Sequence, residues 1–277
     1  MKSLCWNVLG LGSPRAVRRL CFLVKQHNPH LLFLMETKLD KKRMEKVRRK
    51  CGFVHGIEVE AEGSRGGLCM AWKNDISVSL RSFSRWHIDV LIEDNLEEEW
   101  RYTGFYGFPY LKDKNPVWNL LRRLAKESDL HWLVEGDFNE ILYSFEKCGG
   151  IPRDEKRMEA FRETLVDCQL FDIGFSGVRF TWERGNLPET NIRERLDRGL
   201  QMKNVEYSSA PSLFYFRSLS PSFEYKKVES FHKDQKIPFR SLVDHGRISR
   251  NNTKIHLNLE IDKDEMYWEQ RVRQNWL

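Results

Sequence analysis

The sequence lacks any long apolar run: no uninterrupted stretch approaches the ~18 residues that a membrane-spanning helix requires. The N-terminal residues also lack the charged and then apolar arrangement of a secretory signal peptide. The six cysteines form no C-x-x-C pair, and most lie in apolar segments, which favours buried, reduced thiols over a disulfide or zinc framework. These absences predict an intracellular protein that has no contact with a membrane.

Neither sign of charge dominates the sequence, and positive charge is only in small excess. The chain has 46 Lys and Arg against 40 Asp and Glu, which gives a net charge of +6 and a pI of about 8.9. This mildly basic balance suits a polyanionic partner, but it is also common in proteins that never bind nucleic acid. The 277 residues, 40% of them hydrophobic, can bury one large core, so a single α/β domain is expected and a second is not required.

Apolar segments and helical periodicities alternate along the chain. We expect strands at 3–10, 31–37, 66–72, 76–80, 88–92, 100–106, 131–136, 180–182 and 194–198, and helices at 14–24, 41–51, 116–125 and 156–170. The first helix has a good start, because Ser13 can cap it and Pro14 suits its first turn. The run of strands between 66 and 106 favours antiparallel pairing. The sequence therefore predicts a layered α/β (α+β) protein with largely antiparallel sheets.

The segment 134–140, of sequence VEGDFNE, carries the clearest chemical signal. It ends an apolar strand and presents Asp137 and Asn139 two positions apart, and such positions point to the same face of an extended chain. The carboxylate can hold a hard cation or take a proton from water, while the amide can hold an anionic phosphate without repelling it. Because Gly, Asp and Asn also favour turns, a plain turn is the alternative.

Four further polar residues lie near the ends or inside of expected strands: Asn7, Glu36, Tyr106 and Asp197. Each has a simpler interpretation. Asn7 and Glu36 can cap a turn or a helix, Tyr106 can be a core residue, and Asp197 can pair with a neighbouring arginine. It is their order along the chain, more than any one of them, that indicates a functional site.

The order Asn7, Glu36, Tyr106, Asp137-x-Asn139, Thr181-Trp182 and Asp197 resembles the endonuclease/exonuclease/phosphatase superfamily. Within it, the segments CWNVLGLG (5–12), METK (35–38), GGL (66–68), GDFNE (136–140) and RLDR (195–198) look like the endonuclease domain of plant non-LTR (LINE-type) retrotransposons. The resemblance covers roughly residues 1–200. It implies a DNase I-like fold, a two-sheet and largely antiparallel β-sandwich flanked by helices.

The resemblance also implies a metal-dependent hydrolase that cuts DNA phosphodiester bonds with Mg²⁺, or Mn²⁺ in its place. Such an enzyme works in the nucleus and uses no small organic cofactor. Glu36 would be the principal metal ligand, and Asn7 would be the second residue of the metal site and would orient the metal centre. Asp137 would position or deprotonate the attacking water, while Asn139 and Tyr106 would hydrogen-bond the phosphate. The other expected site residues are Asp197 and, as packing support beneath the site and not as a base-stacking group, Trp182.

The sequence departs from the family where the last catalytic strand should carry Ser-Asp-His. Residues 216–222 read FRSLSPS, and the only Asp-His pair in the chain is Asp244-His245. His245 would be the catalytic imidazole with Asp244 as its support, or the two are a polar linker pair. We expect residues 1–222 to form the nuclease-like domain without its last catalytic strand. Residues 223–277 would be a polar linker and charged helical tail, truncated before a reverse transcriptase.

Two functions of different class remain open. The first is a Mg²⁺-dependent endonuclease of LINE type that is degenerate and impaired in activity. The second is a catalytically inactive remnant that at most binds nucleic acid. A lipid or inositol phosphatase is less well supported, because the METK and RLDR segments look like the retrotransposon branch.

Overall fold

The structure, a computed structural model, describes residues 1–202 apart from 94–98, 108, 110–113, 128–129, 176, 178, 186 and 188–189. Several expectations fall elsewhere in the chain. The segment 216–222, Asp244, His245 and the expected C-terminal helix all lie outside the described residues. Within the described part, no helix is long and apolar enough to cross a membrane.

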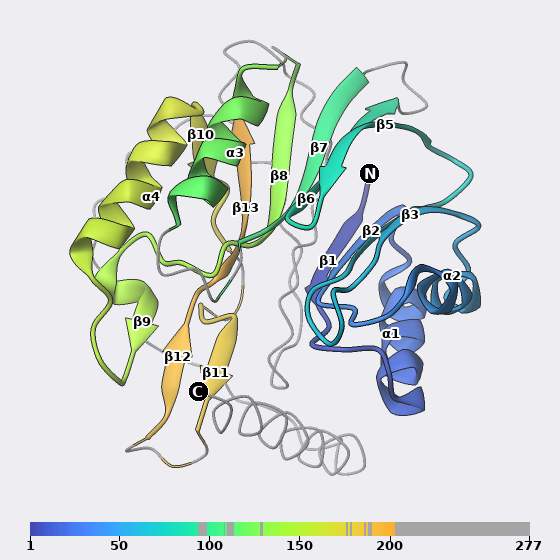
Figure 1. Ribbon diagram of the computed structural model, residues 1–277, viewed down its shortest axis with the longest axis horizontal. Helices are drawn as coiled ribbons and strands as arrows, with labels where there is room; N and C mark the ends of the chain where they lie inside the picture. The colour runs from blue at the N-terminus through green and yellow to red at the C-terminus, as the bar shows by residue number, and fades with distance from the viewer. Residues whose placement is uncertain are drawn as a thin grey trace.

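The N-terminal part of the chain forms a four-stranded sheet with two helices on its outer face (Figure 1). Its strands are β1 (Ser3–Asn7), β2 (Leu31–Met35), β3 (His55–Val59) and β4 (Leu68–Trp72), in the order β1-β2-β4-β3. Helix α1 (Pro14–His27) connects the parallel strands β1 and β2, and α2 (Lys41–Lys50) follows β2. Side chains cap both helices. Ser13 accepts from the Ala16 N–H, as the sequence predicts, and Asp40 accepts from the Arg43 N–H.

A six-stranded sheet faces the first one. Its strands are β5 (Ser77–Ser84), β6 (His87–Glu93), β7 (Glu99–Tyr106), β8 (Trp132–Asp137), β10 (Leu170–Asp172) and β13 (Asp197–Met202), in the order β10-β13-β8-β7-β6-β5. Helix α3 (Asn115–Ala125) connects the parallel strands β7 and β8, and α4 (Glu155–Asp167) packs beside it on the outer face (Figure 1). All other pairings in this sheet are antiparallel.

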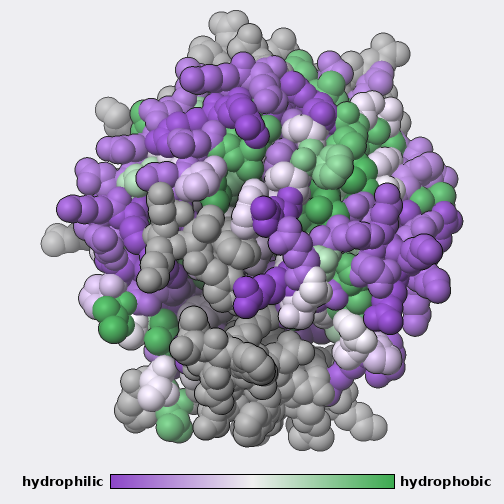
Figure 2. All heavy atoms as spheres, viewed as in Figure 1, coloured by the Kyte–Doolittle hydropathy of each residue, from purple (hydrophilic) through white to green (hydrophobic). Residues whose placement is uncertain are grey.

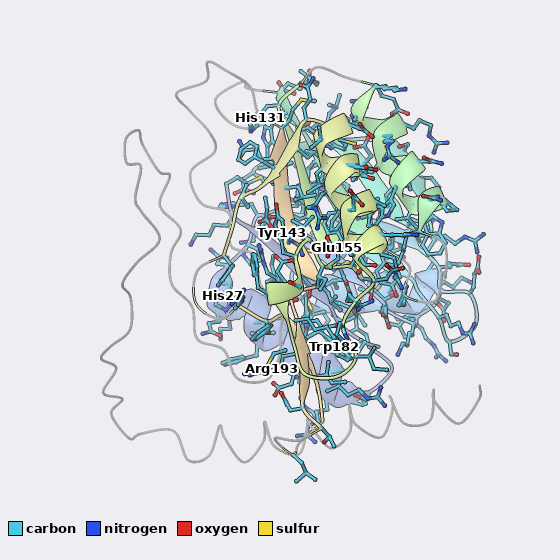
Figure 3. All side chains as sticks on the ribbon, turned by 90° about the vertical axis from the view of Figure 1, so that its left-hand side faces the viewer. His27, His131, Tyr143, Glu155, Trp182 and Arg193 are labelled. Carbon is cyan, nitrogen blue, oxygen red and sulfur yellow. The ribbon has the colours of Figure 1, made fainter. Side chains whose placement is uncertain are left out.

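A small third sheet extends from one end of the sandwich. It contains β9 (Lys147–Cys148), β11 (Trp182–Arg184) and β12 (Ile192–Glu194), and a short 3-10 helix, η1 (Ser144–Glu146), precedes β9. In Figure 3, His131 at the start of β8 lies near one end of the molecule, while Trp182 and Arg193 lie near the other. The carboxyl end of β8 therefore points toward this hairpin.

The core has three main layers. Between the two sheets, Cys5, Phe33, Val90, Tyr102 and Leu133 belong to one buried cluster. Each sheet also packs on its own pair of helices through a separate cluster. Hydrophilic side chains cover the outer surface over both helical layers (Figure 2). The structure confirms the predicted two-sheet sandwich with helices on both sides.

Details of the strand prediction need correction. Strand β4 does not continue into an antiparallel run with β5, because it pairs with β2 and β3 in the first sheet. The sequence prediction missed β3, since its five residues HGIEV are partly exposed and show no clear alternation. The segment Glu194–Arg198 is not one strand: Glu194 ends β12 and Asp197 begins β13. Cys148 is exposed, unlike the buried thiols expected from the sequence.

Candidate active site

Asn7 links two carboxylates that come from different sheets. Its Nδ2 lies 3.0 Å from Asp137 Oδ2 and 3.3 Å from Glu36 Oε1, and it donates to both. The Tyr106 hydroxyl donates to the same Glu36 oxygen over 2.8 Å. Both carboxyl groups are almost fully buried, at 6% exposure for Glu36 and 5% for Asp137. The structure thus brings together four of the residues predicted from the sequence.

The sheet topology explains why these four side chains lie together. Asn7 is the last residue of β1, and Glu36 comes directly after the parallel neighbour β2. In the other sheet, Tyr106 and Asp137 end the parallel strands β7 and β8 and are register partners. Because β1 packs against β8, the carboxyl ends of these four strands lie together at one edge of the sandwich. Asp197 begins the antiparallel strand β13 opposite Asp137, so it lies at the same edge.

Asn139 reaches this edge by a turn. Its φ is +50°, in the left-handed region, and its N–H donates to Asp137 Oδ1 over 2.8 Å. The prediction that Asp137 and Asn139 share one face of an extended strand is therefore wrong, and the turn alternative holds. Yet the turn keeps the side chains adjacent. The buried Asn139 Nδ2 has no hydrogen-bond partner, which leaves an amide donor beside the Asp137 carboxyl.

Left-handed backbone conformations concentrate around these residues. Of six non-glycine residues with positive φ in the described chain, four are Leu9, Glu36, Lys38 and Asn139, with φ of 50–53°. Each such conformation costs on the order of 1 kcal/mol for an L-residue and persists where the surroundings hold it. The Lys38 Nζ bonds the Leu9 carbonyl over 2.8 Å and lies 3.9 Å from Glu36 Oε2. These contacts tie the loops after β1 and β2 together.

Glycines permit the close approach of backbone at the site. The Thr37 N–H and Lys38 N–H donate to the carbonyls of Gly67 and Gly66, and a Cβ on Gly67 would lie 2.4 Å from the Thr37 hydroxyl. Gly136 lies against β7, where an added Cβ would meet the Phe105 carbonyl oxygen at 1.7 Å. The GGL and GDFNE segments thus owe their glycines to packing beside Glu36 and Asp137.

The electrostatic surroundings favour a proton on Asp137 more than usual. The pKa of Asp137 is raised to about 6, chiefly by burial and also by the nearby Glu36 carboxylate, against the opposing hydrogen bonds from Asn7 and Asn139. Lys114, at the N-cap of α3, also lowers it. Burial in turn lowers the pKa of the Lys114 ammonium to about 8, although Glu140 and Asp137 favour its charged form.

A second buried carboxyl lies two residues before Asp137, on the same face of β8. Glu135 is fully buried between the sheets, where Ser3 Oγ approaches both of its oxygens, at 3.1 and 2.9 Å, and the Tyr102 hydroxyl donates over 2.9 Å. Burial raises the pKa of Glu135 to about 7. Cys5 lies beside Glu135, Asp197 and Asp137, and burial together with these carboxylates raises the pKa of its thiol.

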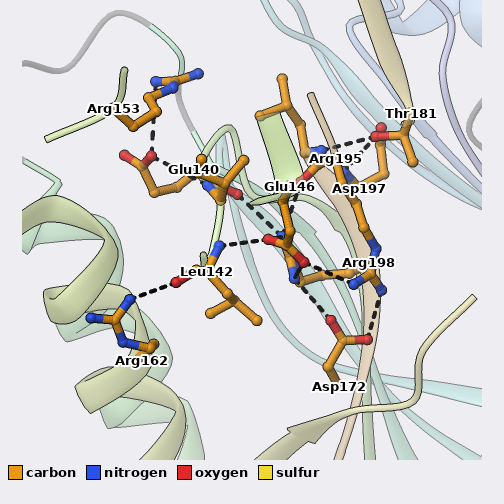
Figure 4. Close-up of polar contacts among 12 residues, drawn as sticks. Glu140, Leu142, Glu146, Arg153, Arg162, Asp172, Thr181, Arg195, Asp197 and Arg198 are labelled. Atoms are coloured by element: carbon orange, nitrogen blue, oxygen red, sulfur yellow. Dashed lines mark hydrogen bonds and ion pairs between the residues drawn. The ribbon is translucent and has the colours of Figure 1, made fainter. Parts of the chain in front are cut away.

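Asp197 is held by the chain around it. The Thr181 hydroxyl accepts the N–H groups of Leu196 and Asp197, at 2.9 and 3.0 Å. The two flanking arginines, which the sequence offered as partners for Asp197, bond elsewhere: Arg195 and Arg198 each bond to Glu146 and Asp172 (Figure 4). This buried network fixes the RLDR segment, in which Asp197 lies opposite Asp137.

Trp182 packs beside the site. It is half-buried and lies against a small cluster of Ile141, Met158 and Leu196, as the sequence prediction of a packing role requires. Sequence reasoning missed Lys114, Glu135, Glu146 and Asp172. Lys114 lies in an irregular segment before α3, and the other three carboxylates occupy positions in or beside strands where no motif distinguishes them.

The site offers oxygen ligands for a hard cation. Within the part of the chain that the structure describes, no three His, Cys, Asp or Glu side chains are grouped to hold an ion. Mg²⁺ needs no such group, because it commonly binds through one or two carboxylates and keeps several waters. Glu36 and Asp137 would supply these carboxylates. Asn7 donates from its amide nitrogen to both carboxylates. It therefore orients the carboxylates and does not offer the cation an oxygen ligand.

Comparison with known proteins defines the class. The model of the endonuclease/exonuclease/phosphatase family matches residues 4–198, so the chain belongs to this family. Its members are hydrolases that act on phosphodiester bonds. No curated protein matches the chain.

Solved structures share the fold at low sequence identity. The endonuclease domain of TRAS1, a telomere-specific non-LTR retrotransposon, aligns with a TM-score of 0.53 at 13% identity, covering 72% of this chain and 84% of that one. The AP endonuclease LMAP from Leishmania major gives a TM-score of 0.54 at 16% identity, with coverage of 72% and 78%. A 3′ phosphatase from Neisseria, bound to product DNA hairpin, gives 0.53 at 17%, with coverage of 72% and 86%.

Proposed function

We propose that this protein is a Mg²⁺-dependent DNA endonuclease of the LINE retrotransposon type whose turnover is impaired. The substrate is a DNA phosphodiester, and the product is a nick with a 3′-hydroxyl end. Plant LINE motifs in the sequence, such as METK and RLDR, support this branch of the family.

One observation carries the proposal: Asn7 bonds Glu36 and Asp137 together at the edge where four strands end. The two carboxyl groups come from facing sheets, and burying both so close is electrostatically unfavourable. Glu36 and Asp137 would hold a divalent cation at this edge, which would offset that cost and would supply charge neutralisation for the phosphate and the leaving oxygen.

The residues of the chain then have separate roles. Asp137 positions the attacking water and accepts its proton, and Asn7 and Tyr106 fix the orientation of the carboxylates. The buried amide of Asn139, which has a free donor, hydrogen-bonds a non-bridging phosphate oxygen. An unpaired buried donor costs about 1–3 kcal/mol. A phosphate oxygen that accepts from this amide removes that cost, which favours binding of the phosphate at the site over leaving it in water.

Impairment follows from the sequence beyond the described residues. The family's Ser-Asp-His strand has no counterpart at 216–222, and Asp244-His245 lies in a polar segment. Loss of one positioned acid-base or phosphate-stabilising group lowers the rate by ~10²- to 10⁴-fold. If His245 replaced the missing histidine, His245→Ala would abolish the remaining activity.

A second function keeps the fold without the chemistry. An inactive remnant that binds nucleic acid would retain Asn7, Glu36 and Asp137 for stability alone. The missing Ser-Asp-His motif favours this alternative.

Incubation of the purified chain with supercoiled plasmid separates the two functions. We expect slow nicking in Mg²⁺ that stops in EDTA, and extension of the nick by a DNA polymerase, which requires a 3′-hydroxyl. Absence of Mg²⁺-dependent nicking at high enzyme concentration would contradict the endonuclease and leave the remnant.

A further inference from the structure

A cluster of positively charged side chains lies beside the carboxyl end of β8. Its members, which we call the cationic cluster, are Lys114, Lys147, Arg153 and Arg157. They come from the start of α3, from β9, from the segment before α4 and from α4 itself. Residues from four separate parts of the chain thus meet next to the candidate active site.

Two buried glutamates hold this cluster in place. Glu140, which is fully buried, pairs with Arg157 Nη2 at 2.7 Å. It also lies 3.8 Å from Arg153 Nη1 (Figure 4). Glu194 at the end of β12 accepts from Arg153 at 2.6 and 3.1 Å and pairs with Lys147 at 2.5 Å. Arg153 therefore connects the loop after β8 to the β11–β12 hairpin.

Three carboxylates lie among the four cations. Glu140 and Glu194 form the ion pairs described above. Lys114 and Arg153 also lie close enough to Asp137 to interact with its charge. The cluster therefore borders the candidate active site.

The cations keep access to solvent. The side chains of Arg157, Arg153 and Lys147 are 34%, 23% and 12% exposed. The buried Nε of Arg157 has no hydrogen-bond partner. Two arginines, from α4 and from the segment before it, converge on Glu140.

We propose that the cationic cluster is a binding subsite for backbone phosphates of the DNA strand next to the scissile bond. Glu140 is its positioning residue: it follows the catalytic Asn139 directly and seats Arg153 and Arg157 at a fixed place relative to Asp137. This inference rests on the proposed function for the identity of the polyanion. It assigns a role to the last residue of GDFNE that is separate from the chemistry.

DNA binding in EDTA tests the subsite without catalysis. The full chain is titrated into a fluorescein-labelled DNA duplex at several NaCl concentrations, and the logarithm of Kd is plotted against that of salt. Each phosphate contact contributes about 0.9 to the magnitude of this slope. Arg157→Gln and Lys147→Gln are expected each to weaken binding and to reduce the slope by ~1, and Arg157→Lys is expected to restore it.

A matched control lies on the opposite helical layer, where Arg49 on α2 is exposed and pairs with Glu45. Arg49→Gln removes the same charge and is expected to leave the slope at the wild-type value. Thermal melting of each variant checks that the fold is intact. Equal slopes for wild type, Arg157→Gln and Lys147→Gln would overturn the subsite even if the protein nicks DNA. A reduced slope in a chain that never nicks would support the subsite and contradict only the endonuclease.

Discussion

Replacement of Glu135 by glutamine is expected to remove a pH dependence of stability that the buried carboxyl imposes. Glu135 has no exposed surface, and burial raises the pKa of its carboxyl from an ordinary 4.5 to about 7, although Ser3 and Tyr102 hydrogen bonds oppose the shift. Between these two values the unfolded chain has released the proton and the folded chain has kept it. Because the folded state then binds more protons, the free energy of unfolding falls as pH rises.

The size of this effect follows from the shift. The change from 4.5 to about 7 corresponds to a loss of about 3 kcal/mol once the pH exceeds the folded value, at 1.36 kcal/mol per pKa unit. Most of this loss, roughly 2 to 3 kcal/mol, falls between pH 5 and pH 8.5. Glutamine keeps the shape and can hydrogen-bond Ser3 and Tyr102, but it has no proton to lose. Glu135→Gln should therefore gain stability relative to wild type as the pH rises.

Urea unfolding at half-unit intervals from pH 5 to pH 8.5 measures this difference. The control is Glu159→Gln on α4, an exposed glutamate for which the same substitution should leave the pH profile parallel to wild type. Parallel profiles for wild type and Glu135→Gln would refute the reasoning, because they would mean that Glu135 ionises at the same pH in the folded and unfolded chains.

Three further predictions address the metal, the backbone and the thiols. Glu36→Gln removes the negative charge that a hard cation needs, so calorimetric titration should show at least a tenfold loss of Mg²⁺ affinity, and an unchanged titration would make Glu36 a structural residue. Gly136→Ala places a Cβ 1.7 Å from the Phe105 carbonyl oxygen and should destabilise the fold by roughly 2 kcal/mol or more in urea, whereas Gly12→Ala, with no atom within 4 Å, should have little effect. The exposed Cys148 should react with a disulfide reagent much faster than the buried Cys5, Cys69 and Cys168 in the native protein, and Cys148→Ser should remove that fast phase. Reaction of the buried thiols at the rate of Cys148 would contradict their burial.

The sequence predicts the strands that carry the site because each of them is a short, mostly apolar segment. Segments 3–7, 31–35 and 132–137 each place one polar residue at or just after the strand end, and the fold brings those ends together. The family motifs supplied the order of the residues. For Asn7, Glu36, Tyr106 and Asp137, this was sufficient to predict that their side chains meet.

Other features depend on tertiary contacts that no local pattern encodes. The crossing of the chain from one sheet to the other after β4 is set by pairing with β2, which lies more than 30 residues earlier. The conformation of Asn139 is set by the hydrogen bond to Asp137, which overrides strand propensity at that position. In the sequence, Glu135 is a polar residue that interrupts an apolar strand. Hydrogen bonds from Ser3 and Tyr102, which lie on two other strands, reduce the free-energy cost of burying it.

The cationic cluster illustrates the same limit. Lys114, Lys147 and Arg153 are separated by 33 and 6 residues, which gives no periodicity and no charge run. Only the fold shows that Glu140 and Glu194 collect them beside Asp137. The net charge of +6 alone does not predict where in the fold the cationic cluster lies.

The nicking rate of Asp137→Asn tests the central claim most directly, because this substitution keeps the size of the side chain and removes the carboxylate that Asn7 holds toward the site. The matched control is Asp167→Asn at the exposed end of α4, where the side chain pairs with Arg122. We predict that Mg²⁺-dependent nicking of supercoiled plasmid falls by at least ~10²-fold in Asp137→Asn, to the level of the EDTA blank, and stays at the wild-type rate in the control. Nicking by Asp137→Asn at the wild-type rate would contradict the account, since the chemistry would then lie elsewhere.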